Sequence, residues 1–214
     1  WVSAMYFRDR NNAAQLLAQA LKAYKGKNPL VLAIPRGAVP MGKLIADELG
    51  GEVDVVLVRK LRAPGNPELA IGAVDETGWC HIADYAGTTG ANAEYIEREK
   101  FAQLETIRRR RAEYTPVHPP IDPAGRIVIV IDDGLATGAT MISALHALRV
   151  RKPQKLICAT PVSPSDTLDK VRAYADEVVC LEAPVNFYAV GQFYLDFPQV
   201  EDEEVIAILR GSKK

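Results

Sequence analysis

Residues 127–140, which read IVIVIDDGLATGAT, constrain the fold of this chain more than any other stretch. The five β-branched aliphatic residues at 127–131 are typical of a strand buried on both faces of a parallel sheet. Two carboxylates, Asp132 and Asp133, follow directly, and then come a loop rich in Gly and Thr and an apolar helical pattern. We therefore expect a strand–loop–helix unit of an α/β fold, with both carboxylates at the carboxyl end of the strand.

The loop between this strand and the helix, residues 134–140, predicts a phosphate site. A turn that opens a helix directs free backbone N–H groups and the positive end of the helix dipole into one spot. Thr137 and Thr140 can add hydroxyl donors. Asp132 and Asp133 would accept hydrogen bonds from a diol or hold a divalent cation. The stretch therefore predicts a sugar phosphate with neighbouring hydroxyls; the simpler alternative is a strand whose last Asp caps the next helix.

The composition is that of an ordinary globular chain and gives no sign of a nucleic-acid or membrane partner. Of the 214 residues 48% are hydrophobic and 25% are charged, and the net charge is −1. The three cysteines have no paired spacing, which favours a reduced, cytoplasmic protein. No apolar run approaches the roughly 18 residues of a membrane span, and no signal-peptide pattern is present. The first residue is Trp1 and Met5 lies just inside, so whether Trp1 to Ala4 are native stays open.

Apolar strand patterns alternate with helical patterns along most of the chain, which predicts a parallel sheet flanked by helices. Further strands are expected at 30–34, 53–58, 69–74, 155–160 and 178–181. Asp9 is expected to cap a first helix that ends near Tyr24, and other helices are expected to end near residues 49, 151 and 174, with a last one over 201–209.

Residues 79–123 interrupt this alternation and predict a helical insertion in an otherwise single domain spanning 1–214. A long charged helix is expected from an Asn92 cap to about Tyr114, and a proline-rich linker then returns the chain to the core. Four consecutive arginines, 108–111, lie near its C-terminal end, where cations complement the dipole. Because they point in different directions on a helix, we prefer a solvated face to a nucleic-acid site.

Residues 127–140 resemble the phosphoribosyl-pyrophosphate (PRPP) signature of type I phosphoribosyltransferases: an aliphatic strand, two acids, a variable trio, then T-G-x-T. The stretch is neither a P-loop, since no Lys precedes the closing Thr, nor the GxGxxG dinucleotide turn. The resemblance implies a parallel-sheet fold with a C-terminal hood, here residues 183–214. It also implies that Asp132 and Asp133 hold the ribose hydroxyls. The 5′-phosphate would be held by Ala136, Thr137, Gly138, Ala139 and Thr140.

A second site is expected where residues 35–38, Pro-Arg-Gly-Ala, follow an apolar strand. In open α/β sheets ligands bind beyond the carboxyl ends of strands, and a cation beside an unobstructed backbone suits pyrophosphate. The segment resembles the pyrophosphate loop of xanthine–guanine phosphoribosyltransferases, S-R-G-G-L-V-P. Arg36 and Gly37 match that loop, whereas Pro35 and Ala38 depart from it. The alternative is a strand-to-helix turn with a surface arginine.

Arg59 and Lys60 are expected to end a strand ahead of a mobile turn segment at 61–68. Adenine phosphoribosyltransferases have a similar Arg-Lys before a mobile loop, in cationic contact with pyrophosphate, and closure of such a loop would exclude water. The alternative is a pair of surface cations.

The aromatic tail at 187–197 resembles the purine-binding hood of 6-oxopurine phosphoribosyltransferases. This places Phe187, Val190 and Asp196, together with Thr160, in a candidate base pocket. Core packing of the aromatic residues is the alternative. Two departures leave the base open, because those enzymes have an acidic residue where this chain has Ala136 and a lysine where it has Thr160.

The resemblance implies an enzyme of nucleotide salvage that transfers 5-phosphoribose from PRPP to a nucleobase-like nitrogen, with Mg²⁺ on the pyrophosphate and ribose oxygens, assisted by Asp132 and Asp133. Arg36 and Lys60 would offset charge on the pyrophosphate and complete the catalytic set. A homodimer is one expectation. The alternatives are a non-catalytic PRPP-binding regulator and a sugar-phosphate hydrolase or isomerase. The scattered histidines, His81, His118 and His146, have no metal-ligand spacing.

Overall fold

A five-stranded parallel sheet forms the centre of the molecule in a computed structural model that describes residues 7–212. Trp1 to Ala4 lie outside the described residues. The strand order is β2-β1-β6-β7-β8, and the bounds are β1 Leu30–Ala33, β2 Glu52–Val55, β6 Ile127–Ile131, β7 Lys155–Val162 and β8 Glu177–Glu182. The predicted parallel sheet is confirmed, and β6 has the predicted bounds.

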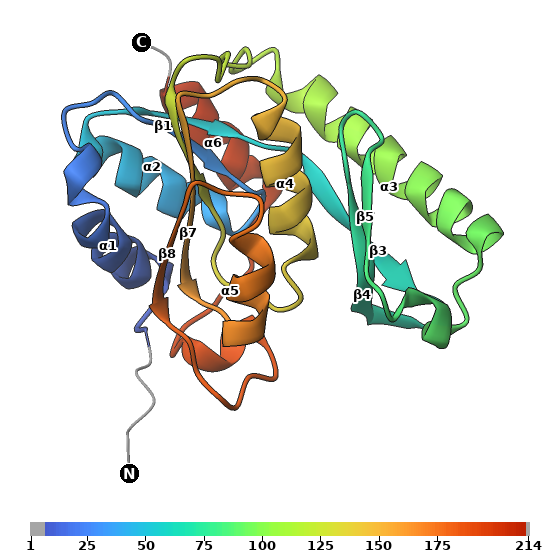
Figure 1. Ribbon diagram of the computed structural model, residues 1–214. Helices are drawn as coiled ribbons and strands as arrows, with labels where there is room; N and C mark the ends of the chain where they lie inside the picture. The colour runs from blue at the N-terminus through green and yellow to red at the C-terminus, as the bar shows by residue number, and fades with distance from the viewer. Residues whose placement is uncertain (1–6, 213–214) are drawn as a thin grey trace.

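Helices cover both faces of this sheet, as the alternation in the sequence predicts (Figure 1). They are α1 Arg10–Ala20, α2 Ala38–Leu49, α4 Ala139–Arg149, α5 Ser165–Val171 and α6 Asp202–Gly211. Three short 3-10 turns, η1 Lys22–Tyr24, η2 Ala86–Thr89 and η3 Val190–Phe193, complete the connections. Asp9 caps α1 as expected, because its side chain accepts a hydrogen bond from the Asn12 N–H at 2.8 Å.

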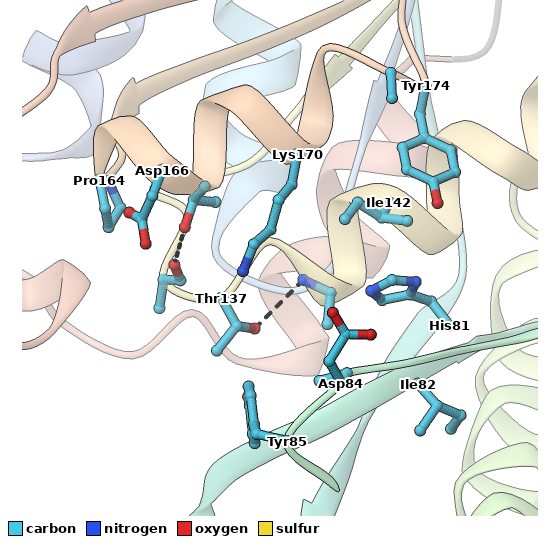
Figure 2. A pocket seen from close by; sticks show the side chains of 15 residues that line it. His81, Ile82, Asp84, Tyr85, Thr137, Ile142, Pro164, Asp166, Lys170 and Tyr174 are labelled. Carbon is cyan, nitrogen blue, oxygen red and sulfur yellow. Dashed lines mark hydrogen bonds between the residues drawn. The ribbon is translucent and has the colours of Figure 1, made fainter.

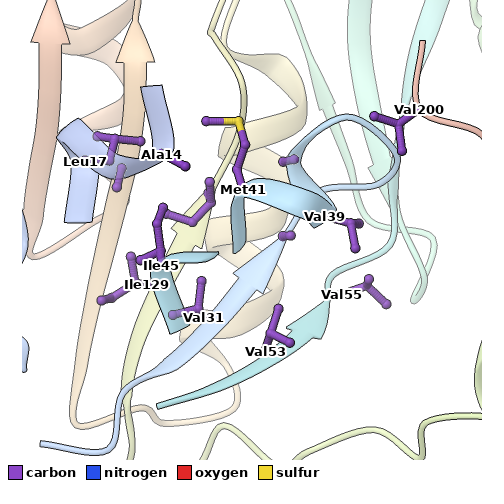
Figure 3. Packing of buried hydrophobic residues seen from close by; sticks show 14 of the residues in the cluster. Ala14, Leu17, Val31, Val39, Met41, Ile45, Val53, Val55, Ile129 and Val200 are labelled. Atoms are coloured by element: carbon purple, nitrogen blue, oxygen red, sulfur yellow. The ribbon is translucent and has the colours of Figure 1, made fainter. Parts of the chain in front are cut away.

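Successive strand residues point to opposite faces, so each strand contributes to two cores. On one face Val31 and Ile129 pack with Leu17 of α1 and Ile45 of α2 (Figure 3). On the other face the alternate residues of the same strands pack against α4; Leu32, Val130 and Leu145 belong to this core. Each fully buried aliphatic side chain contributes roughly 1.5–3 kcal/mol, so the two cores hold the strand ends in fixed positions.

The segment between β2 and β6 forms a second, antiparallel sheet, which corrects two predictions. Its strands are β3 Val58–Ala63, β4 Asn66–Asp75 and β5 Cys80–Ile82, in the order β3-β4-β5. The strand predicted over 53–58 is two strands, because pairing with β1 ends where Val55 lies opposite Ala33 and the chain then leaves the main sheet. The mobile turn predicted over 61–68 is wrong, because β3 and β4 form a hairpin whose tight turn contains Gly65 at φ 68°.

The long helix α3, Ala93–Tyr114, has the predicted bounds and the predicted Asn92 cap, whose side chain accepts from the Tyr95 N–H at 2.8 Å. It packs on β3, while α4 lies between the second sheet and the main sheet (Figure 1). The returning segment is tied to the core where the Ile121 N–H donates to Asp54 of β2 at 2.9 Å. Within residues 7–212 no helix is both long and apolar enough to cross a membrane.

Candidate functional site

The loops that follow β1 and β6 lie side by side, because these strands are neighbours and Ala33 lies opposite Ile131. Gly37 of the first loop approaches Asp133 of the second so closely that a Cβ at Gly37 would clash with the Asp133 carboxylate. The Pro35–Arg36 peptide bond in the first loop is cis. Two of the predicted segments, residues 35–38 and 132–140, therefore form one edge of the sheet and can contact one ligand.

Of the two carboxylates, Asp133 is paired with an arginine and Asp132 is not. Asp133 Oδ2 accepts from Arg10 Nε at 3.2 Å, and only 17% of the Asp133 side chain is exposed. Asp132 Oδ1 accepts from the Asp133 N–H at 2.9 Å. Burial, followed by the charge of Asp133, raises the pKa of Asp132 well above its usual range. Burial raises the pKa of Asp133 as well, although the guanidinium of Arg10 opposes that shift. The site is thus short of hydrogen-bond donors and positive charge, which ribose hydroxyls or a cation can supply.

Arg10, at the start of α1, is a site residue that the sequence did not indicate. Its guanidinium stacks 3.8 Å from the centre of the Phe197 ring and donates to the carbonyl of Pro198 in the C-terminal tail. The hydroxyl of Tyr194 donates to the Asp133 carbonyl at 2.6 Å. Arg10 lies 123 residues from Asp133, so no local pattern could have joined them. Two distant segments of the chain, the start of α1 and the C-terminal tail, therefore hold the loop that contains the second carboxylate.

The loop after the carboxylates has backbone geometry that suits an anion. Gly138, at φ 80°, is the N-cap residue of α4, so no cap side chain occupies the first N–H groups of that helix. The Ala139 N–H lies 3.3 Å from Thr137 Oγ1, whereas Thr140 and Met141, in the first turn, have no carbonyl of α4 to pair with. The dipole of α4 adds positive potential at the same point. The predicted residues 136–140 thus form a bend that can receive a phosphate.

A cavity of about 530 Å³ lies beside this bend (Figure 2). Its lining includes Thr137 of the bend, Lys170 of α5, and His81 and Asp84 of the segment around β5, and Lys170 extends toward Thr137. Burial lowers the pKa of His81, which favours the neutral imidazole. Neither Asp132 nor Asp133 lines the cavity, so it adjoins the phosphate bend and not the carboxylates.

Arg36 and Arg59 belong to different elements, and each has a partner within the protein. Arg36 Nη1 lies 3.7 Å from Asp202 Oδ2 at the start of α6. Arg59 is predicted to lie at a strand end, but it lies inside β3. Its Nε donates to Gln103 of α3 at 2.9 Å. Since neighbouring strand residues point to opposite sides, Lys60 faces away from Arg59. The predicted Arg-Lys pair is therefore divided between two sides of β3.

The four residues of the predicted base pocket do not converge. Thr160 is fully buried inside β7. This strand is predicted to end at residue 160, but it runs to Val162. The Thr160 hydroxyl donates to the Val162 carbonyl at 3.4 Å. The ring of Phe187 packs 5.0 Å from that of Phe193. Asp196 is exposed and lines a cavity of about 220 Å³ that Arg10 also lines. Of the four, Val190 lies at the PRPP-like loop, next to Gly134.

The chain offers few ligands for a metal of its own. Within residues 7–212 no group of three or more His, Cys, Asp or Glu side chains is arranged to hold a metal ion. Asp132 and Asp133 are the acidic pair at the candidate site, and both have raised pKa values. Two carboxylates fit a cation that the oxygens of a bound substrate also hold.

Comparison with known proteins identifies relatives over nearly the whole chain. The profile of the phosphoribosyl transferase domain matches residues 5–198. The crystal structure of TT1426 from Thermus thermophilus is 45% identical and superposes with a TM-score of 0.81, covering 98% of this chain and 100% of that one. Two proteins from strains of Mycobacterium tuberculosis, provisionally named phosphoribosyl transferases, are 40% identical over 204 residues. This match covers 95% of the chain but 46% of those proteins, so the chain spans about half their length.

Proposed function

The chain belongs to the type I phosphoribosyltransferase family, and from that premise we propose that it transfers 5-phosphoribose from PRPP to a nucleobase-like nitrogen and releases pyrophosphate. The observation that carries the proposal is the meeting of two loops at one sheet edge. One contains Arg36 and Gly37, and the other contains the paired carboxylates and the phosphate bend. These parts match the three parts of PRPP, namely pyrophosphate, ribose and 5′-phosphate.

The ribose end is assigned to the loop after β6. The backbone N–H groups at the start of α4, with Thr137 and Thr140, receive the 5′-phosphate. Asp132 and Asp133 accept hydrogen bonds from the ribose hydroxyls. In the reaction the bond from the anomeric carbon to pyrophosphate breaks and a bond to the acceptor nitrogen forms. The anomeric carbon gains positive character meanwhile, and two buried carboxylates nearby stabilise that charge.

The leaving group is assigned to the cationic side of the same edge. Arg36 donates to the pyrophosphate oxygens, and Gly37 leaves the backbone open for their approach. Arg59 adds a second guanidinium from β3, and Lys60 completes the proposed set from the other side of that strand. Mg²⁺ bound to PRPP, with Asp132 and Asp133 assisting, would neutralise part of the charge on the departing pyrophosphate.

The acceptor is proposed only as a class, a nitrogen of a nucleobase-like ring, and the proposed role is nucleotide salvage. Val190, next to the PRPP-like loop, is the best supported of the proposed base contacts. Phe187 and Asp196 lie in the same tail as Val190, whereas Thr160 is buried in β7. Ala136 offers no side-chain base for the acceptor proton, which favours an acceptor that loses its proton to solvent or to pyrophosphate.

The same proposal covers the organisation of the chain. Residues 1–214 form one phosphoribosyltransferase domain with an insertion at about 79–123 and a hood at about 183–214, in a cytoplasmic protein that can form a homodimer. The cysteines Cys80, Cys158 and Cys180 are free.

The test is a screen of nucleobases with PRPP and Mg²⁺, read by mass spectrometry, alongside exchange of labelled pyrophosphate into PRPP. We expect a 5-phosphoribosyl product with at least one base, and loss of that product in Asp133→Asn. Binding of PRPP with neither product nor exchange would instead identify a PRPP-binding regulator. Absence of PRPP binding by calorimetry would refute both.

A further inference from the structure

One face of α3 turns a half-buried arginine inward. This arginine is Arg110, which lies at helical spacing from three buried residues of the same helix: Gln103, Ile107 and Tyr114. This corrects the prediction that the arginine run at 108–111 is simply a solvated face.

The other arginines of the run have different surroundings. Arg108 is exposed and pairs with Glu105 at 2.8 Å, and Arg111 pairs with Glu76. Arg109 is exposed. Among the residues that the structure describes, Arg110 forms no ion pair with a carboxylate, although it lies on the inward stripe of α3. Arg110 therefore differs from Arg108 in its surroundings but not in its chemistry or its helix.

Arg110 is part of a cluster of cations that α3 shares with β3 and with the loop after β1. Burial lowers the pKa of Arg59 to about 10, and the positive charges of Arg110, Arg62, Arg36 and Arg109 act in the same direction. Arg59 is still protonated at neutral pH, so these guanidinium groups repel one another. Arg59 donates to the neutral amide of Gln103 and forms no ion pair within the described part of the chain. Asp202 pairs with Arg36 at 3.7 Å, and a further anion would offset the repulsion that remains among the other guanidinium groups.

A buried hydroxyl in the same cluster has no partner. Tyr114 is fully buried, and its hydroxyl makes no hydrogen bond within the described residues. The charges that act on it are Arg110, Asp202, Glu113 and Arg36. Buried hydroxyl groups are normally paired, because an unpaired one loses its hydrogen bonds to water without replacement. The Tyr114 hydroxyl is thus an unused donor within reach of the charges of Arg36 and Arg110.

We propose that α3 supplies Arg110 and the Tyr114 hydroxyl to the pyrophosphate end of the site, so that a diphosphate is held by three elements, with Arg36 from the β1–α2 loop and Arg59 from β3. This inference rests on the proposed function. A diphosphate is favoured over a monophosphate because several guanidinium groups match several negative charges. The cluster also adjoins the ribose end of the site, since Arg36 precedes Gly37, which approaches Asp133.

The test is calorimetric titration of the protein with magnesium pyrophosphate and, separately, with ribose 5-phosphate. Arg110→Gln should weaken pyrophosphate binding by about tenfold or more, as expected for a lost charge-assisted hydrogen bond. The same variant should bind ribose 5-phosphate like the parent. Arg108→Gln is the matched control, because it removes the same charge from the same helix at an exposed position, and it should leave both affinities unchanged.

Tyr114→Phe separates ligand binding from folding. Because the hydroxyl has no partner in the free protein, its removal should leave the melting temperature unchanged or raise it, yet it should weaken pyrophosphate binding. If Arg110→Gln and Tyr114→Phe bind pyrophosphate as tightly as Arg108→Gln, the inference is overturned, while ribose 5-phosphate binding by the parent would leave the proposed function standing. If the parent binds neither ligand, both fail.

Discussion

At the scale of single residues, the two carboxylates after β6 differ in what stabilises their charge. Asp133 faces Arg10, whose guanidinium partly offsets the cost of burial. Asp132 accepts one backbone hydrogen bond and has the negative charge of Asp133 beside it. Ionised Asp132 is therefore a cost to the free protein that a ribose hydroxyl or a cation can relieve, as is common at sites that bind substrate.

Asp132→Asn should raise stability at neutral pH and reduce PRPP binding. The folded pKa of Asp132 is raised, so its contribution favours the folded state below the pKa of a free carboxyl, about 4, and is lost as pH rises through the folded value. The melting temperature of the variant should therefore exceed that of the parent by an amount that grows from pH 4 to pH 8, as measured by calorimetry. Asp169→Asn, at an exposed position, is the control. A more stable parent at pH 8 would contradict this account.

Residue-scale features were predictable from the sequence where their cause is local. The caps at Asp9 and Asn92 each accept from an N–H three residues ahead, and the continuous run of five β-branched residues identifies β6 as a buried strand. The contact between Arg10 and Asp133 has no such signal, because it depends on how α1 packs on the sheet. The same is true of Tyr114, whose lack of a partner is a property of the packed helix.

At the scale of elements, strand bounds that depend on which strand pairs with which could not be predicted from the sequence. The bounds of β6 and α3 agree with prediction, because their apolar pattern and cap specify them locally. The run at 53–58 is uniformly apolar apart from Asp54, yet it divides where β1 ends and β4 takes over as the pairing strand. This division places Arg59 inside β3 and directs it toward α3, which a strand-end position would not do.

The close contact between η3 and the PRPP-like loop is possible because residue 134 is a glycine. A Cβ at Gly134 would lie 2.5 Å from Val190 Cγ1 and 3.0 Å from Val162 Cγ1. Gly134→Ala should therefore displace η3, lower the melting temperature and accelerate hydrogen exchange at residues 187–197. Adding Val190→Ala should restore much of the stability by making room, which gives a double-mutant cycle with strong coupling. Additive losses in the two single variants would show that the loop and η3 are independent.

At the scale of the whole molecule, the two sheets are joined by a short return path that is anchored on one buried carboxylate. Asp54 of β2 accepts from the Val55 N–H at 2.8 Å and from the Ile121 N–H at 2.9 Å, and it lies 3.4 Å from His118 Nδ1. Its side chain is 3% exposed. The chain that follows α3 thus meets β2 at Asp54 through the hydrogen bond from the Ile121 N–H and the nearby imidazole of His118.

Asp54→Ala should destabilise the protein by about 2 kcal/mol or more, because buried N–H groups lose their acceptor. Asp122→Ala is the matched control, because it removes an exposed carboxylate from the same returning segment. Asp122 pairs with Arg151, and surface pairs contribute at most about 1 kcal/mol. Urea unfolding measures both changes. Hydrogen exchange should further show faster opening of 115–121 and α3 than of β6, because the lost bond from the Ile121 N–H ties the segment after α3 to the main sheet. Uniform acceleration throughout the molecule would mean that Asp54 stabilises one cooperative fold and does not position α3.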